Sequence, residues 1–186
     1  MELCINHFYF ILDKFYNDFP DQNLMINKGE NHCRPCFFSF KDNNGLFWMI
    51  PISSKIKKYK KIYKHKTMNG NKCDTLYFAK VLGKEKVFLL QNMFPIIKEY
   101  IANEYLMKNG LPVEIPNKDS EVIIKKCKKL IALLHHGKKE LIFPDVQLIV
   151  NKLTNASKWN QHSFYYLVKD KLMKYFKEEK LIKNRK

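Results

Sequence analysis

Two strongly apolar runs, CFFSF at 36–40 and LFWMI at 46–50, stand on either side of a short polar insert. The insert reads Lys-Asp-Asn-Asn-Gly, and Asn and Gly readily adopt the left-handed backbone conformations of tight turns. Short runs rich in aromatic side chains are typical of strands. The pattern therefore predicts a β-hairpin in which Cys36–Phe40 pairs with Leu46–Ile50, and Pro51 is expected to close the second strand.

Four further segments belong to the same predicted sheet. The aromatic run His7–Ile11 is expected to form a short strand. Asp74–Val81 and Lys86–Met93 stand on either side of Leu-Gly-Lys-Glu and are predicted to form a second hairpin. Pro95–Tyr100 is expected to extend the sheet. The first half of the chain is therefore expected to be mainly β.

Helical patterns are concentrated in the second half. Apolar side chains recur every three or four residues from Ser120 to His135, and the same spacing returns from Phe164 to Phe176. His135-His136 precedes Gly137, which predicts a C-terminal cap. A brief helix is also predicted over Asp13–Phe19, with Asp13 as its N-cap.

A sheet followed by helices predicts an α+β fold, with helices packed on a mostly antiparallel sheet. A chain of 186 residues, 46% of them apolar, is long enough to bury one core. We therefore expect a single domain over 1–186. Residues 1–100 should be mainly sheet with a short helix and a basic segment, and residues 118–180 mainly helical.

The sequence also bears on the compartment. No run approaches the roughly 18 uninterrupted apolar residues of a membrane-spanning helix. Glu2, Asn6 and His7 interrupt the N-terminal apolar run, and no small-residue cleavage site follows, unlike in a secretory signal. The 5 cysteines are odd in number and scattered, so they do not indicate a disulfide framework. We expect a cytoplasmic protein without a membrane association.

The formal net charge is +16, from 34 Lys and Arg against 18 Asp and Glu. Such an excess favours a polyanionic partner, and nucleic acid comes before an anionic membrane because the basic run lacks a broad apolar face. A Lys-rich, Arg-poor balance is also what AT-rich codon usage produces. The positions of the charges are therefore more informative than their total.

The charge is concentrated between Ser53 and Lys66, a segment with seven Lys, two Tyr and no acidic residue. It is expected to be either a helix or a basic surface segment. If a helix begins there, Ser53 or Ser54 would cap it and its N-terminal N–H groups would favour a phosphate. Lysines interleaved with aromatic rings suit RNA, because ammonium groups meet phosphates while rings stack on bases. The predicted RNA-binding residues are Lys41, Lys58, Tyr59, Lys60, Lys61, Tyr63, Lys64, His65 and Lys66.

The stretch before the first hairpin carries a different set of reactive groups. Arg34 is the only Arg before residue 185, and its rigid fork can bind phosphate in a bidentate way that Lys cannot. His32 could shuttle a proton, as could His65 at the end of the basic run. Cys33 and Cys36 form a CxxC, but no second ligand pair accompanies it, so small side chains on a strand are the simpler interpretation than zinc. No metal and no cofactor are expected.

These residues resemble a known family, the type III toxin–antitoxin endoribonucleases of the ToxN, CptN, TenpN and AbiQ types. Arg34 stands nineteen residues before Ser53 in the segment Pro51-Ile52-Ser53-Ser54-Lys55, which is similar to the family's Pro-aliphatic-Ser/Thr-Ser segment with its upstream basic residue. The segment 88–96, FLLQNMFPI, is similar to the family's strand Leu-x-Asn-x-Met-Ile-Pro-Ile, and Phe8–Ile11 is similar to its opening strand. The resemblance spans about residues 7 to 153.

The resemblance implies a compact, strongly twisted sheet with packed helices, similar to the MazF/Kid toxin fold. It implies RNA cleavage without metal, by attack of the ribose 2′-OH, leaving 2′,3′-cyclic phosphate and 5′-OH ends. It also implies a pseudoknotted antitoxin RNA, cut from a tandem-repeat transcript, that binds the toxin in a closed hetero-oligomer. The substrate would be cellular or phage RNA, and the role phage defence by abortive infection or plasmid maintenance.

The candidate catalytic residues are Arg34, Ser53, Ser54, Lys55, Lys57 and His32. Arg34 can hold the charge of the phosphorane, and the two hydroxyls can hydrogen-bond the scissile phosphate. Repulsion within a cluster of like charges disfavours protonation of Lys55 and Lys57, which suits an acid or base role. The alternative is a non-catalytic RNA-binding module that uses the same basic surface.

Overall fold

The computed structural model describes residues 2–27 and 34–154. His32, Cys33 and the predicted C-terminal helix from Phe164 to Phe176 lie outside these residues, as does the whole of the part of 118–180 that follows Thr154. Over the described residues no helix is both long and apolar enough to cross a membrane.

Seven strands form one sheet in the described part of the chain, and every pair of neighbours is antiparallel. The strands are β1 (Phe8–Ile11), β2 (Pro35–Lys41), β3 (Phe47–Ser53), β4 (Leu76–Val81), β5 (Lys84–Leu89), β6 (Phe94–Ile96) and β7 (Ile101–Glu104). Their order is β4-β5-β3-β2-β1-β7, with β6 paired to the start of β3. β3 is therefore the central strand, with β2 along one edge and β6 and then β5 along the other.

The hairpin predicted from the apolar runs is present as β2 and β3, with Phe37 opposite Ile50. The prediction that Pro51 closes the second strand is wrong, because β3 continues to Ser53. The pairing of β3 changes at Pro51. Pro51 is the last residue of β3 that pairs with β2, and Ile52 is the first that pairs with β5. A residue without an N–H is tolerated at such a change of ladder.

The second predicted hairpin is also present, as β4 and β5. Val81 pairs with Lys84, so the turn consists of Leu82 and Gly83 alone, both with positive φ, 51° and 73°. β5 ends at Leu89, earlier than expected, and a short 3-10 turn follows. Pro95–Tyr100 extends the sheet only in part, because β6 ends at Ile96 and a second 3-10 turn follows. The 3-10 turns are Met68–Gly70, Leu90–Asn92, Lys98–Tyr100 and Lys139–Leu141.

The helices in the described residues are α1 (Asp13–Asp18), α2 (Ile56–Lys66), α3 (Asn117–His135) and α4 (Val146–Thr154). The helix predicted over Asp13–Phe19 is confirmed, but Leu12 and not Asp13 occupies its N-cap. The Asp13 carboxylate instead accepts a hydrogen bond from the Asn27 amide at 2.8 Å. α3 is confirmed and ends at His136 as its C-cap, before Gly137 with φ 85°.

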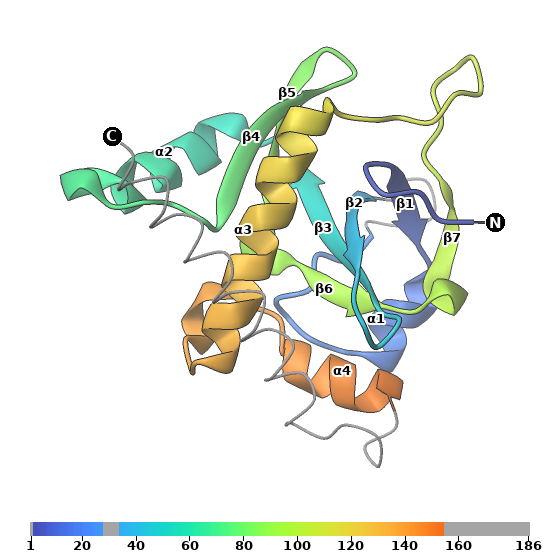
Figure 1. Cartoon of the computed structure of the whole chain (residues 1–186). Coiled ribbons are helices and arrows are strands. Elements are labelled where there is room, and N and C mark those ends of the chain that lie inside the picture. The colour runs from blue at the N-terminus through green and yellow to red at the C-terminus, as the bar shows by residue number, and fades with distance from the viewer. Residues whose placement is uncertain (1, 28–33, 155–186) are drawn as a thin grey trace, which may run out of the picture.

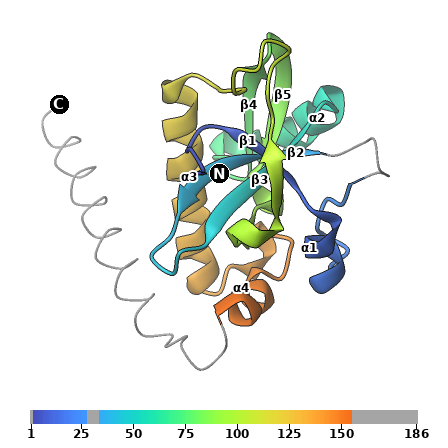
Figure 2. The same ribbon diagram turned by 90° about the vertical axis from the view of Figure 1, so that its right-hand side faces the viewer.

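The helices lie on both faces of the sheet. Figure 1 shows α3 crossing the sheet, and Figure 2 shows α3 on one side with α1 and α2 on the other. Side chains alternate accordingly along β2: Phe37 packs in the core beneath α3, whereas Cys36 and Phe38 pack in the core that contains α1. The expected α+β architecture is confirmed.

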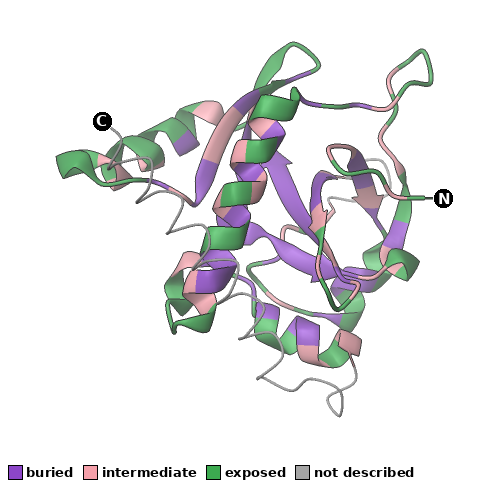
Figure 3. Cartoon of the chain, in the orientation of Figure 1, coloured by how far each residue is buried: buried purple, intermediate pink, exposed green. Residues whose placement is uncertain are grey.

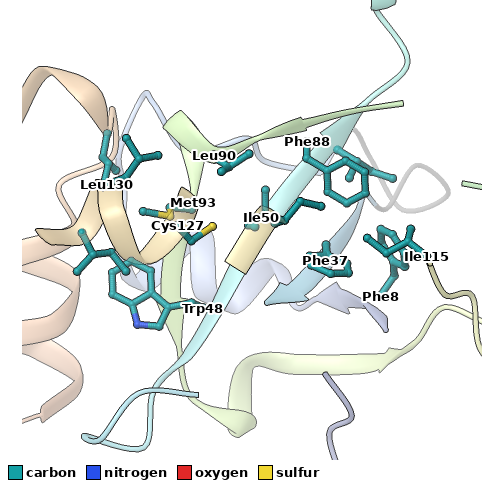
Figure 4. Close-up of a cluster of buried hydrophobic side chains, with 14 of the residues drawn as sticks. Phe8, Phe37, Trp48, Ile50, Phe88, Leu90, Met93, Ile115, Cys127 and Leu130 are labelled. Atoms are coloured by element: carbon teal, nitrogen blue, oxygen red, sulfur yellow. The ribbon is translucent and has the colours of Figure 1, made fainter. Parts of the chain in front are cut away.

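The larger core packs α3 against the sheet, with side chains from β1, β2, β3 and β5 (Figure 4). Phe37 lies edge-on to both Phe8 and Phe88, with ring centroids 5.3 Å apart in each pair. Farther along, Trp48 packs with Cys127 and Leu130 of α3. This aromatic packing fixes the position of β2 and β3 relative to β5.

Candidate nucleic-acid interface

The first feature of the site is the relation between Arg34 and Ser53. Cys36 pairs with Pro51 in the β2–β3 ladder, and the same register carried two residues further reaches Arg34 and Ser53. Because side chains alternate along a strand, both residues lie on the sheet face that holds Cys36. The nineteen-residue spacing noted in the sequence is therefore the length of hairpin that brings these two residues opposite each other.

Arg34 is partly exposed and is held at the edge of α2. Its backbone N–H donates to the Asn27 side-chain oxygen at 3.0 Å, and its Nη1 lies 3.8 Å from the Met25 sulfur. Burial raises the pKa of the Tyr59 phenol, and the nearby Arg34 guanidinium opposes that rise. The guanidinium therefore lies close to Met25 and Tyr59, where a ligand approaching α2 would meet it.

The two consecutive serines have different surroundings. Ser53 is 8% exposed and its Oγ accepts a hydrogen bond from the Lys55 N–H at 3.2 Å. Ser54 is exposed and its Oγ accepts a hydrogen bond from the Lys86 ammonium at 2.6 Å. In each case the hydroxyl proton remains able to donate to a phosphate oxygen.

The expectation that Ser53 or Ser54 caps the helix is wrong, because Lys55 is the N-cap of α2. Ser53 is still paired with Val87 in the β3–β5 ladder, so the chain is extended there and the helix begins only after Ser54. The serines therefore lie at the end of a strand and not at the start of the helix.

The basic segment is a helix, as one of the two sequence interpretations expected, and Figure 3 shows most of α2 as exposed. The predicted site residues exposed on or just before this helix are Lys55, Lys57, Lys58, Lys60, Lys61, Tyr63, Lys64 and His65. They form a cationic surface at the end of β3, which we call the α2 surface.

Two predicted RNA-binding residues do not contribute in the expected way. Tyr59 is 8% exposed and packs in the small core of Leu76 and Val87 beneath α2, so its ring is not available to stack on a base. Lys41 lies at the opposite end of the hairpin, paired with Phe47, so the length of β3 separates it from Ser53. Tyr63 is 38% exposed and keeps an accessible ring.

Two lysines of α2 are held by other side chains. Lys60 forms an ion pair with Glu85 at 2.8 Å. The Lys66 ammonium donates to Thr75 Oγ1 at 2.8 Å and to Gln91 Oε1 at 3.2 Å, and both acceptor residues are buried. Lys66 therefore joins the end of α2 to the residues that immediately precede β4 and follow β5.

Replacing Lys66 with Met is expected to lower the free energy of unfolding by about 1–3 kcal/mol, because it leaves two buried acceptors without their charged donor. Replacing the exposed Lys64 with Met should change stability by no more than about 0.5 kcal/mol. Urea unfolding followed by circular dichroism measures both. Equal stabilities of the two variants would show that the Lys66 contacts do not support the fold.

Sequence reasoning missed Lys86, Met25 and Asn27. Lys86 reaches Ser54 through the pairing of β5 with β3, which are far apart in the chain, so no local pattern marks it. Of the CxxC, Cys36 is a buried strand residue, as the simpler interpretation expected, and burial raises the pKa of its thiol to about 12.

The fold and site together define an α+β protein with a cationic, hydroxyl-bearing site at the end of its central strand. No family model matches the sequence, and no curated protein matches it. Among solved structures, the chain is similar to AbiQ, a lactococcal anti-phage endoribonuclease belonging to the type III toxin–antitoxin system. The TM-score is 0.59 at 18% identity, covering 82% of this chain and 98% of AbiQ.

A second similar structure comes from a bacterial antiviral system that a processed non-coding RNA regulates, with a TM-score of 0.49 at 18% identity, covering 71% of this chain and 88% of that chain. At such identity the likeness to AbiQ establishes the fold. The expected resemblance is thereby confirmed at the level of the fold.

Proposed function

We propose that this chain is an endoribonuclease that cleaves RNA without a metal ion and acts as the toxin of a type III toxin–antitoxin system. The proposal is supported by the β2–β3 register, which continued two residues beyond Cys36 and Pro51 brings Arg34 opposite Ser53 beside the α2 surface, on a fold shared with an endoribonuclease. The substrate of such an enzyme would be cellular or phage RNA in the cytoplasm.

The reaction is an internal phosphoryl transfer. The ribose 2′ oxygen attacks the adjacent phosphorus, the bond from phosphorus to the 5′ oxygen breaks, and a 2′,3′-cyclic phosphate and a 5′-OH result. A base removes the 2′ proton, an acid supplies a proton to the 5′ oxygen, and cations stabilise the doubly charged phosphorane.

The residues of the site can divide these tasks. The Arg34 guanidinium offers parallel N–H donors to two phosphorane oxygens. Ser53, whose Oγ already accepts the Lys55 N–H, can direct its own proton to the phosphate. Lys55 and Lys57 are exposed next to the serines and are the candidate acid and base, with His32 as the third candidate.

The same surface suits the RNA partner that the resemblance implies. A single-stranded or unpaired RNA segment would lie along the α2 surface, with lysines meeting phosphates and Tyr63 contributing its ring. A repeat-derived pseudoknot RNA that covers this surface would block the site and hold the toxin inactive in a closed toxin–RNA assembly.

The proposal is tested by incubating the purified chain with end-labelled single-stranded RNA in buffer containing EDTA. We expect cleavage, with mass spectrometry identifying 2′,3′-cyclic phosphate and 5′-OH ends. RNA with a 2′-deoxy sugar at the mapped cut should stay intact. Binding without cleavage would replace the enzyme with a non-catalytic RNA-binding module, and cleavage of the 2′-deoxy RNA would contradict the 2′-OH mechanism.

The biological part of the proposal has its own test. Expression of the chain alone should arrest bacterial growth, whereas expression of the Ser53→Ala variant should not. Short tandem repeats followed by a transcription terminator are expected directly upstream of the gene. Normal growth with abundant folded wild-type protein would argue against a toxin.

A further inference from the structure

A second cation–hydroxyl pair, formed by Lys86 and the catalytic candidate Ser54, lies beside Arg34 and Ser53. β3 and β5 pair through Ile52 with Phe88 and Ser53 with Val87. The same register carried one residue further places Ser54 opposite Lys86, and the Lys86 ammonium donates to Ser54 Oγ at 2.6 Å. The pair is thus built by the sheet and joins two strands.

This pair lies on the other face of the sheet end from Arg34. Ile52 and Phe88 belong to the core beneath α3, whereas Val87 packs with Tyr59 beneath α2. Because side chains alternate, Ser54 and Lys86 follow the face of Ile52 and Phe88, and Ser53 follows the face of Val87. At the end of β3, Ser53 and Arg34 therefore lie on one face of the sheet, and Ser54 and Lys86 lie on the other. The two serines are consecutive residues.

Lys86 retains the capacity to bind an anion. Its neighbour Glu85 points to the opposite face, where it pairs with Lys60. Within the described residues, no carboxylate forms an ion pair with Lys86. An ammonium has three donors and Ser54 takes one, so donors remain for a ligand, together with the Ser54 hydroxyl proton.

We propose that Lys86 and Ser54 form a subsite for a backbone phosphate next to the scissile one, which assigns Ser54, one of the catalytic candidates, to the neighbouring phosphate. The identity of the ligand as RNA rests on the proposed function. A strand that crosses the end of β3 would place its reacting phosphate on the Arg34 and Ser53 side and the neighbouring phosphate on the Lys86 and Ser54 side. The subsite holds the strand and takes no part in the bond changes.

The direct test is the salt dependence of binding to a 12-nucleotide, mixed-sequence RNA that is 2′-O-methylated throughout and so lacks any 2′-OH. Replacing Lys86 with Met should weaken binding about two- to five-fold, as loss of one solvent-accessible charge contact does. It should also lower the slope of log affinity against log salt by about 0.7, the value for one phosphate contact on a single strand.

Lys84→Met is the matched control, because Lys84 lies two residues earlier on the same strand and face but is exposed at the hairpin turn. It should leave the salt slope unchanged, and Lys86→Arg should restore most of the affinity. Thermal unfolding of each variant checks the fold. An unchanged slope in folded Lys86→Met and Lys86→Gln would overturn the subsite.

Cleavage kinetics separate this subsite from the reacting centre. With cleavable RNA, Lys86→Met should raise KM and leave kcat within about two-fold, the pattern of an interaction made equally before and in the transition state. A fall in kcat at constant KM would place Lys86 on the reacting phosphate and overturn the proposal. If the wild type binds but does not cleave, the proposed function fails while the slope measurement still decides the subsite.

Discussion

Replacing Arg34 with Met is expected to lower kcat for RNA cleavage by roughly 10²–10³-fold, the loss seen when one preorganised donor to a developing anion is removed. The β2–β3 register, continued two residues beyond Cys36 and Pro51, brings Arg34 opposite Ser53, and its guanidinium lies next to Met25. The charge on the phosphate rises in the transition state, so the loss should fall on kcat more than on KM. Single-turnover cleavage of end-labelled RNA measures it.

The bidentate geometry of the Arg34 guanidinium should contribute to cleavage activity in addition to its charge. Arg34→Lys keeps the charge but not the bidentate geometry, so its activity should lie between those of the wild type and Arg34→Met. Lys108→Met is the control for net charge, since Lys108 is exposed in the loop after β7. Full activity of Arg34→Met, with an unchanged unfolding temperature, would remove Arg34 from the catalytic residues.

The sequence predicted best what depends on short stretches of chain. Turn chemistry identified both hairpins, and helical spacing identified α3. The relation of Arg34 to Ser53 was also accessible, because Arg34 immediately precedes one local hairpin and Ser53 ends it. The spacing of nineteen residues carries structural information only because that hairpin forms.

The elements that were missed depend on distant partners or on weaker local signals. β7 is an edge strand with two exposed residues, Ala102 and Asn103, so it lacks the apolar run of a central strand. α4 has a local signal in Asp145, whose carboxylate accepts the Leu148 N–H at 3.0 Å as an N-cap does. The helix has only 9 residues, however, and the periodicity of so short an apolar segment does not by itself identify a helix.

The same distinction explains the errors within the site. Seven lysines in one segment predicted a cationic surface, but which of them are free to bind depends on the β4–β5 hairpin. Glu85 of that hairpin forms an ion pair with Lys60, and Thr75, just before β4, accepts a hydrogen bond from Lys66. The apolar side chains of the hairpin bury Tyr59. The sequence shows the positive charge of the segment. Which lysines are free to bind RNA and which stabilise the fold depends on tertiary contacts.

Replacing Phe37 with Ala is expected to lower the free energy of unfolding by about 3–5 kcal/mol, through lost burial and the cavity left behind. Phe37 is 0% exposed and its ring contacts Phe8 of β1 and Phe88 of β5. For a chain of this size the midpoint of thermal unfolding should fall by about 6–20 °C.

Phe143→Ala is the matched control, because it makes the same chemical change at a side chain that is 44% exposed, and it should cost no more than about 1 kcal/mol. Phe37 holds β2 against β5 as well as β1, so its loss should loosen the register that places Arg34 opposite Ser53. Cleavage activity of Phe37→Ala should therefore fall at temperatures below its unfolding transition, whereas Phe143→Ala should retain it. Equal stability of the two variants would show that the aromatic cluster does not hold the sheet together, and the site would then depend on the backbone ladders alone.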